Sequence, residues 1–366
     1  MENTSTRFYG LDHLRALAIL LVLMFHYRSF SHPSWIDNYG RFGWTGVDLF
    51  FVLSGFLISN QLFKEIKRDN KVHLRNFYIK RFFRIIPPYL FVLGLYFAFP
   101  FFREREALPP LWKFITFSQN LGLDVIHHGA FSHAWSLCIE EQFYLLLPLF
   151  LLFSLKVKVL NKLVVIVLFL ILVSIVARFI RWEEVININT KNFWQEWYMK
   201  IYYPTYTRID GLSIGVLIGY LYQYSTQFNS FIRSRGNQLF ILGLLLLALS
   251  FWFCIDPASE KASIFGFTFV SFSFGLLVVA AISGTSLLSQ KKSFITSQLA
   301  SLSYAIYLSH KGVIHMIQAG LNHLHFRTSG NMALIIALVF CILTGLLFKY
   351  IIEKPSFKLR NQLLNK

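Results

Sequence analysis

The residues LDHLRALAILLVLMFHYRSF, from Leu11 to Phe30, decide how the rest of this chain can fold. Ten residues separate Arg15 from His26, and all of them are Ala, Leu, Ile, Val, Met or Phe. On an α-helix these two side chains share one face and lie about 16 Å apart along the axis. An ionisable group inside such a helix is costly and usually faces a bundle interior or a wet cavity. The stretch therefore predicts a membrane-spanning helix that carries part of a functional site.

The composition of the 366-residue chain is that of a membrane protein. It is 55% hydrophobic and 18% aromatic, with only 14% charged residues, whereas a soluble domain has about 25%. The net charge of +17 does not indicate nucleic acid, because the basic residues lie between apolar runs, as in a multi-spanning protein. Cys138, Cys254 and Cys341 lack the spacing of a disulfide framework or a zinc site. We expect no disulfide, no bound metal and no nucleic-acid partner.

Apolar runs near the length of about 20 residues that crosses a bilayer predict an all-α integral membrane protein with about ten transmembrane helices. These runs are 11–30, 44–62, 85–101, 135–154, 160–179, 207–224, 237–254, 264–283, 296–319 and 331–352. The segment 110–123 is apolar but short and interrupted, so we interpret it as interfacial or re-entrant. If it crosses, the count becomes eleven.

The basic residues predict the orientation of the chain. With the N-terminus inside, the inner loops hold about twice as many Lys and Arg as the outer loops, which places both termini in the cytoplasm. No small-residue cleavage site follows the first apolar run, so we expect that helix to be retained rather than removed as a signal peptide. We therefore expect a multi-pass protein of the cell (inner) membrane. Residues 1–366 form one polytopic domain, with its core at about 8–355 and no appended soluble domain.

This topology places several charged side chains at similar depth in the outer leaflet. They are His26, Asp48, Glu140, Glu141, Arg208 and Asp210. One interpretation is a polar reaction centre, and the other is a set of interhelical ion pairs that hold the bundle together. We favour the reaction centre for His26 with Glu140 or Glu141. Both interpretations stay open for Arg208 and Asp210.

A second group of charges lies at the inner face. Arg81 and Arg84 are three residues apart, so they are neighbours on a helix and could hold a phosphate or diphosphate together. Ordinary positive-inside charge would explain them too, but Arg15 lies at the same depth. These arginines would form a positively charged opening at the inner face, and the acid–base side chains would lie about 16 Å deeper in the bundle. This arrangement fits a long ligand with an anionic group at one end and a reactive group at the other. Coenzyme A has this form.

The remaining polar residues give weaker signals. Tyr304, Tyr307 and His310 are spaced three apart and form one inward-facing stripe, which either packs or lines a cavity. The other histidines lack clean metal-ligand geometry on one helix face, and we expect no metal site among them; they are His127, His128, His133, His315, His323 and His325.

Several motifs together resemble the membrane-bound acyltransferase 3 family, O-acyltransferases that modify bacterial surface sugars. Besides the arginine–histidine pair, they are GVDLFFVLSGFLIS at 46–59, RFFRIIPPY at 81–89, HAWSLCIEEQFYLLLPL at 133–149, RIDGLSIG at 208–215, LSYAIYLSH at 302–310 and IEKPSFKLR at 352–360. They occur in the family's order, and the resemblance spans roughly 8–360.

The resemblance implies that acetyl passes from cytoplasmic acetyl-CoA to a hydroxyl of a cell-surface glycan or its lipid-linked precursor. Exopolysaccharide, lipopolysaccharide and peptidoglycan all stay open as acceptors. Acetyl-CoA would be the acyl-donor substrate, with no permanently bound cofactor. The resemblance implies catalytic roles for His26, Glu140 and Asp48 and donor binding by Arg15, Arg81 and Arg84. The expected substrate-binding or structural polar layer comprises Glu141, Trp135, Arg208, Asp210, Tyr304, Tyr307 and His310.

The chain departs from the family pattern in two ways. Lys311 and Gly312 follow His310, where Trp-Pro is usual, which puts the shape of the cavity wall there in doubt. Without a soluble C-terminal domain, the chain would acylate its acceptor directly or hand the group to a separate extracytoplasmic protein.

We hypothesise that His26 is the general base or a transient acyl carrier, and that Asp48 or Glu140 orients its imidazole as in a catalytic triad. The alternative from another class is a transporter or flippase that uses the buried charges as a relay. No pair of broken helices occurs at matching positions in two halves, which argues against it. A non-catalytic scaffold would leave the buried charges without a purpose.

Overall fold

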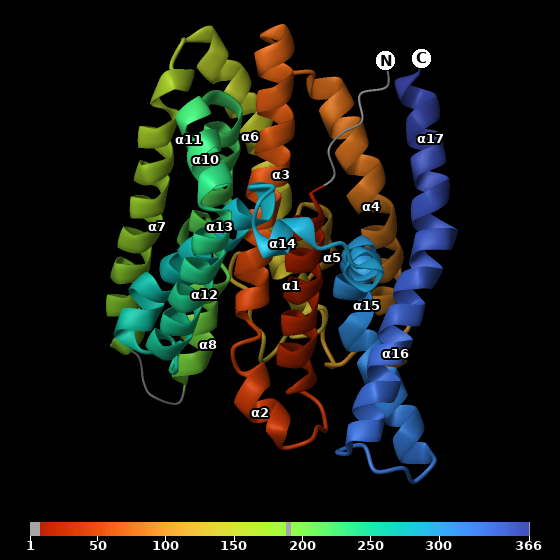
Figure 1. The fold of residues 1–366 in the computed structure, drawn as a ribbon. Helices are drawn as coiled ribbons and strands as arrows, with labels where there is room; N and C mark the ends of the chain where they lie inside the picture. Colours follow the sequence, from red (N-terminus) through yellow and green to blue (C-terminus); the bar gives the residue numbers. More distant parts are fainter. Residues whose placement is uncertain (1–7, 188–191, 366) are drawn as a thin grey trace.

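The computed structural model describes residues 8–187 and 192–365, and within these ranges the chain is helical and contains no strand (Figure 1). The prediction of an all-α membrane protein is confirmed. The longer helices are α1 (Tyr9–Tyr27), α3 (Thr45–Asp69), α4 (Leu74–Ala98), α6 (Trp135–Lys156), α7 (Leu163–Ile186), α10 (Asp210–Tyr224), α12 (Gly236–Phe253), α13 (Phe267–Ile282), α15 (Phe294–His323), α16 (Asn331–Phe348) and α17 (Lys354–Leu364). Shorter helices are α2 (Trp35–Gly40), α5 (Leu111–Ile115), α8 (Phe193–Trp197), α9 (Thr205–Arg208), α11 (Thr226–Ser234) and α14 (Leu287–Gln290).

Eight helical segments of the described chain are long and apolar enough to cross a membrane. The predicted spans 207–224 and 296–319 also form helices but fall outside this group. The first is split at Ile209, which leaves α10 with 15 residues, and α15 has 30 residues but carries a polar stripe. Between residues 110 and 123 the only α-helix is α5, with five residues, which is too short to cross a bilayer.

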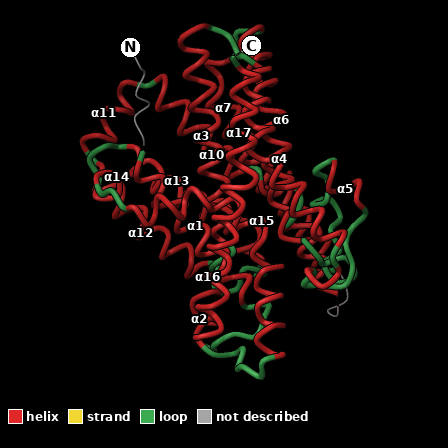
Figure 2. The backbone as a smooth tube through the Cα atoms, turned by 90° about the vertical axis from the view of Figure 1, so that its right-hand side faces the viewer, coloured by secondary structure: helices red, strands yellow, loops and turns green. Residues whose placement is uncertain are grey.

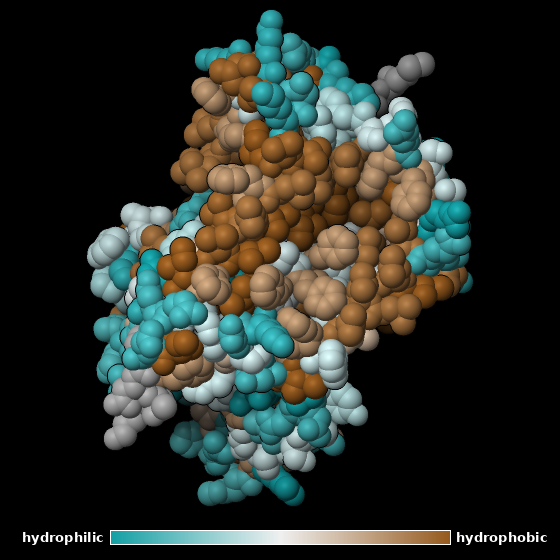
Figure 3. Space-filling model, turned by 90° about the vertical axis from the view of Figure 1, so that its left-hand side faces the viewer, coloured by the Kyte–Doolittle hydropathy of each residue, from teal (hydrophilic) through white to brown (hydrophobic). Residues whose placement is uncertain are grey.

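In Figure 1, α1 runs downward and α3 returns upward, whereas α17 continues in the direction of α16 and ends at the top of the view. Figure 2 shows α5 and its flanking loops at one side of the bundle. On the face drawn in Figure 3, a broad hydrophobic band lies between hydrophilic ends, as expected for a surface in contact with lipid.

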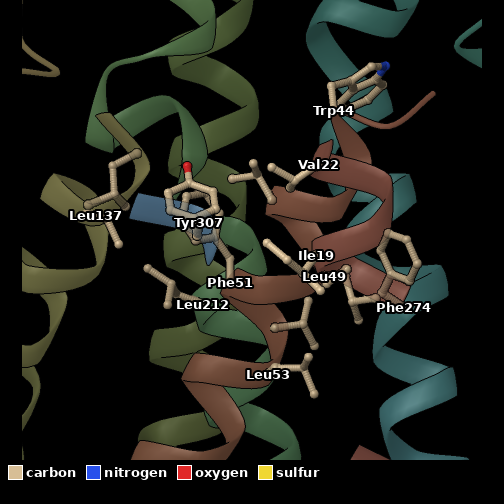
Figure 4. Packing of buried hydrophobic residues seen from close by; sticks show 14 of the residues in the cluster. Ile19, Val22, Trp44, Leu49, Phe51, Leu53, Leu137, Leu212, Phe274 and Tyr307 are labelled. Carbon is tan, nitrogen blue, oxygen red and sulfur yellow. The ribbon is translucent and has the colours of Figure 1, made fainter. Parts of the chain in front are cut away.

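Helices α3 and α10 pack closely because glycines line their contact. Gly211, Gly215 and Gly219 recur every four residues along α10. A Cβ atom at Gly215 would collide with the carbonyl oxygen of Val52, and one at Gly55 with that of Leu212. Small residues let membrane helices approach this closely where larger side chains would hold them apart. Apolar side chains of α1, α3 and α13 pack beside this contact (Figure 4).

Two ion pairs cross the interior of the bundle. Arg208 donates to Asp48 at 2.8 Å, and Arg178 donates to Asp210 at 2.9 Å. All four side chains are at most 1% exposed. Arg208 and Asp210 are therefore partners in interhelical ion pairs, the second of the two interpretations left open by the sequence. Arg178 lies within α7 and joins it to α10 through Asp210.

We expect Asp48→Asn to destabilise the bundle strongly. The substitution keeps the shape of the side chain but leaves the Arg208 guanidinium buried without a counter-charge, which costs about 3–5 kcal/mol. Thermal unfolding of purified protein in detergent measures the effect.

The control is Glu184→Gln, the same chemical change in an exposed pair with Arg181, where the loss should stay below about 1 kcal/mol. Equal melting temperatures for the two variants would show that the Asp48–Arg208 pair does not hold the fold together.

Candidate functional site

A cavity of about 310 Å³ lies among α1, α3, α4, α6 and α15. Its charged lining consists of Arg15, Arg81, Arg84, Glu140 and Glu141. The three arginines come from α1 and α4, so the structure brings together the residues that the sequence predicted for donor binding. A smaller cavity of about 280 Å³ shares Arg15 and Arg84 with it.

The arginine side chains of this cavity are available to an anion. No carboxylate of residues 8–187 and 192–365 lies within 4 Å of their guanidinium nitrogens. Arg81 makes a long hydrogen bond of 3.5 Å to Gln61 and lies near the Tyr144 ring. Guanidinium groups bind phosphate through paired N–H donors. The cavity therefore suits the phosphates of a nucleotide-like ligand.

The structure places Glu140 and Glu141 in this arginine cavity. Glu140 accepts hydrogen bonds from Ser54 at 2.8 Å and Tyr144 at 3.3 Å. The expectation of a shared layer with His26 is wrong, because it is His133 that contacts the histidine. Glu140 follows His133 by seven residues, which is about 10 Å along a helix.

His26 lies in a cluster of three histidines. Its Nδ1 is 2.9 Å from Nε2 of His310, and the His133 ring centroid is 5.8 Å from that of His26 and 4.8 Å from that of His310. His310 and His133 are at most 1% exposed, whereas the His26 side chain is partly accessible. The cluster joins α1, α15 and the turn before α6. His26 is the member that a substrate can reach.

The hydrogen bonds of this cluster define which nitrogen carries each proton. Nδ1 of His310 lies 2.8 Å from the carbonyl oxygen of Tyr307, which can only accept a hydrogen bond. Nδ1 of a neutral His310 is therefore the donor, and Nε2 accepts from Nδ1 of His26. This leaves the lone pair of His26 on Nε2. His310 holds His26 in the tautomer that a base or nucleophile needs.

The partner of His26 differs from the one predicted. Asp48 was expected to orient His26, but its Oδ1 is bonded to Arg208 on the other side of α3. Glu140, the other candidate, is bonded to Ser54 and Tyr144. The orienting residue in the structure is His310, which the sequence placed in a polar stripe and in the substrate-binding or structural polar layer but not beside His26.

Tyr307 and Ser136 lie between the cavity and the histidines. Both residues line the cavity. The Tyr307 hydroxyl donates to the carbonyl oxygen of His133 at 2.7 Å, so the Ser136 hydroxyl is the donor in the 2.5 Å contact between the two side chains. The Tyr307 ring centroid is 6.0 Å from that of His310. One layer of side chains therefore separates the arginine cavity from the histidine cluster.

The two residues that depart from the family pattern lie beside this cluster. Lys311 is 3.1 Å from Glu104 and donates to Ser132 at 3.3 Å. A Cβ atom at Gly312 would collide with the Phe102 ring. The wall is closed here by an ion pair and a tightly packed glycine.

The remaining predicted residues serve different purposes. Tyr304 lines the arginine cavity and donates to the carbonyl of Ile85 at 3.0 Å. Trp135 lies under the Arg208 guanidinium, 5.3 Å from the carbon to the ring centroid. Trp135, Arg208 and Asp210 thus belong to the structural ion-pair layer.

Sequence reasoning missed two residues here. It considered His133 only among the histidines without metal-ligand geometry, and it quoted Ser136 only within a motif. The available signal was their position in HAWSL, at the start of a helix whose next turns carry two glutamates. Among the described residues, no group of three or more His, Cys, Asp or Glu side chains has the geometry to hold a metal ion.

Comparison with known proteins gives consistent matches. Residues 8–352 match the acyltransferase 3 family, described as an acyltransferase domain. The chain is 27% identical to the O-acetyltransferase OatA of Staphylococcus aureus over 95% of its own length and 58% of that protein. It is 30% identical to the peptidoglycan O-acetyltransferase OatA of Listeria monocytogenes over 83% of its length and 49% of that protein.

A third relative is the putative peptidoglycan O-acetyltransferase YrhL of Bacillus subtilis, 27% identical over 94% of this chain and 54% of that protein. The chain thus spans about half the length of the curated relatives it matches. No solved structure matches. The family match covers the arginine cavity, the histidine cluster and nearly every described helix, and the chain belongs to the acyltransferase 3 family of multi-pass membrane proteins.

Proposed function

We propose that the protein is a membrane O-acetyltransferase that moves acetyl from cytoplasmic acetyl-CoA to a hydroxyl of peptidoglycan or its lipid-linked precursor. The observation that carries this proposal is a cavity lined by three arginines, which have no carboxylate partner within 4 Å among the described residues, next to a histidine whose Nε2 holds the lone pair. The names of the relatives support the acceptor.

In this proposal the arginine cavity receives the donor. Arg15, Arg81 and Arg84 hold the phosphates of acetyl-CoA through charge-assisted hydrogen bonds. The pantetheine arm then covers the distance from Arg15 to His26, about 16 Å along α1. Tyr307 and Ser136 lie on this route, and they shift aside to admit the thioester.

Nε2 of His26 performs the chemistry by one of two routes. As a general base it removes the proton of the acceptor hydroxyl, the oxygen attacks the thioester carbonyl, the C–S bond breaks, and the proton passes to the CoA sulfur. As a carrier it attacks the carbonyl itself and CoA leaves as thiolate. The acetylated ring then holds the positive charge until the acceptor hydroxyl attacks the acetyl carbon. The C–N bond breaks, neutral His26 is regenerated, and the hydroxyl proton is taken up by the CoA thiolate.

Both routes require His310 to keep the proton on Nδ1 of His26. In each route the His26 ring becomes cationic, and its Nδ1–H donates to Nε2 of His310 throughout. A neutral histidine therefore fills the place that a carboxylate holds in the serine-protease triad. The orientation is fixed without adding a charge to the interior of the bundle.

We expect His26→Ala to lower acetyl transfer by about 10²–10⁴-fold, because it removes the base or carrier. The assay is thiol release from acetyl-CoA by purified protein with peptidoglycan fragments present. Release of one thiol per protein without acceptor would select the carrier route.

His323→Ala is the matched control, since His323 is exposed at the end of α15. Equal turnover of wild type and His26→Ala would contradict the proposal. Thiol release that needs no gradient also separates an enzyme from a transporter.

We expect Arg81→Ala to raise the KM for acetyl-CoA about tenfold or more while kcat changes little. The lost charge-assisted hydrogen bond to phosphate is worth about 1.5–3 kcal/mol. Arg75→Ala is the control, because Arg75 is an exposed arginine on the same helix and outside the cavity. If both variants shift the KM equally, general positive charge rather than the cavity binds the donor.

We expect His310→Leu to lower kcat by about 10²–10⁴-fold with little change in the KM for acetyl-CoA. Leucine cannot accept the proton of His26, so the imidazole loses its fixed tautomer. His310→Gln should recover at least part of the rate, because its amide can both donate to the Tyr307 carbonyl and accept from His26. Equal kcat values for the Leu and Gln variants would show that His310 acts only in packing.

A further inference from the structure

A second cavity, of about 410 Å³, opens near the other end of α1. Its aromatic lining includes Phe25, Trp44, Trp194, Trp197 and Tyr198. These residues come from three elements, α1, α8 and the π-helix Tyr198–Tyr202, together with the segment that leads into α3. Aromatic rings with polar edges form surfaces on which the apolar faces of sugar rings pack. The cavity thus has the lining of a carbohydrate site.

Two arginines give this aromatic cavity a positive charge. Arg28 and Arg41 line it, and its lining contains no acidic residue. Arg41 lies over the Phe42 ring, and no carboxylate of the described residues lies within 4 Å of its guanidinium. Arg28 is held by Asp37 through Nε at 3.3 Å, so its terminal nitrogens remain available. A ligand with a negative group is therefore favoured over a neutral one.

Asp37 stays ionised beside this arginine. A hydrogen bond from His32, and then the one from Arg28, hold the pKa of the Asp37 carboxyl below its usual range. The carboxylate lies outside the cavity lining and fixes one edge of Arg28. The arginine is thus positioned before a ligand arrives.

Trp44 supplies an unused hydrogen-bond donor. The residue is 4% exposed, and its Nε1 has no partner among the described residues. By contrast, Nε1 of Trp197 donates to Ser263 at 2.8 Å. In Figure 4 the indole nitrogen of Trp44 points away from the packed side chains labelled beside it. A buried N–H donor without a hydrogen-bond partner costs free energy unless a ligand supplies the acceptor.

The aromatic cavity and the arginine cavity lie on opposite sides of the histidine cluster. Phe25 is the neighbour of His26, with ring centroids 5.5 Å apart. Arg15, in the other cavity, precedes Phe25 by ten residues, about 15 Å along the helix. The reacting histidine therefore lies between two cavities of different chemistry.

We propose that this aromatic cavity is the acceptor subsite and that it binds an acidic saccharide. This inference rests on the proposed function and adds where the acceptor binds and which chemical class it belongs to. Sugar rings pack on Trp194 and Tyr198, a carboxylate binds Arg41 and Arg28, and Trp44 donates to a sugar oxygen. A neighbouring ring of the same glycan chain then presents its hydroxyl to His26.

The test measures binding directly, so that its result does not depend on acetyl transfer. The probe is a tetrasaccharide of alternating N-acetylglucosamine and N-acetylmuramic acid, titrated calorimetrically into the full chain in detergent. The comparison ligand is the neutral N-acetylglucosamine tetramer. We expect the acidic tetrasaccharide to bind at least tenfold more tightly than the neutral one.

We expect Arg41→Ala to abolish the preference for the acidic tetrasaccharide. We expect Trp194→Ala to weaken the binding of both ligands about tenfold. Arg327→Ala and Trp112→Ala are matched controls, because both residues are exposed and lie outside the cavity. Both controls should bind as wild type does. A preference that survives Arg41→Ala, or undiminished binding by Trp194→Ala, would overturn the proposal.

The same titrations separate this inference from the proposed function. Selective binding that depends on Arg41, without any acetyl transfer, would uphold the saccharide site and contradict the enzyme. The opposite result is acetyl transfer that depends on His26, together with a KM for the acidic tetrasaccharide that Arg41→Ala does not change. This result would uphold the enzyme and contradict the site.

Discussion

The cost of placing a charge in an apolar bundle governs where each ionisable side chain of this protein lies. An isolated charge in the hydrocarbon region is unfavourable by several kcal/mol or more. Arg178, Arg208, Asp48 and Asp210 meet this constraint by pairing, and all four are buried. Arg15, Arg81 and Arg84 meet it by facing a cavity instead. Pairing thus distinguishes the charges that join helices of the bundle from those that line the cavity.

The same constraint explains why a histidine orients His26. A carboxylate in the position of His310 would bring a negative charge to a place where the neighbouring side chains, Tyr307 and His133, are buried. An imidazole fixed by the Tyr307 carbonyl directs the proton of His26 without adding that charge. The nearby charges of Lys311 and Glu104 are paired with each other.

The sequence predicted the helical class, the position of nearly every long helix and the group formed by Arg15, Arg81 and Arg84. These follow from local periodicity and from depth along single helices, which is one-dimensional information. It could not predict that Asp48 binds Arg208 while His310 binds His26, because rotation of a helix about its axis decides which neighbour a side chain meets. Glu140 was placed too near His26 for a related reason. The helix α6 begins at Trp135, as the predicted span does, but the sequence does not show how α6 is offset along the bundle from α1. In the structure His133 lies beside His26, while Glu140 is bonded to Ser54.

In the proposed function, the two cavities toward either end of α1 make transfer across the membrane a problem of access rather than of distance. Donor phosphates bound at Arg15 would leave about 16 Å for the pantetheine arm to reach His26, and an acceptor from the opposite side would meet the Phe25 ring first. Tyr307 and Ser136 close the donor side through hydrogen bonds that a small side-chain movement can break. Phe25 makes its contact with His26 through ring packing alone. The donor side thus has a polar barrier and the acceptor side an aromatic one, so each substrate of the proposed reaction can approach His26 separately. Water that enters with the acceptor is then kept from the thioester of the donor.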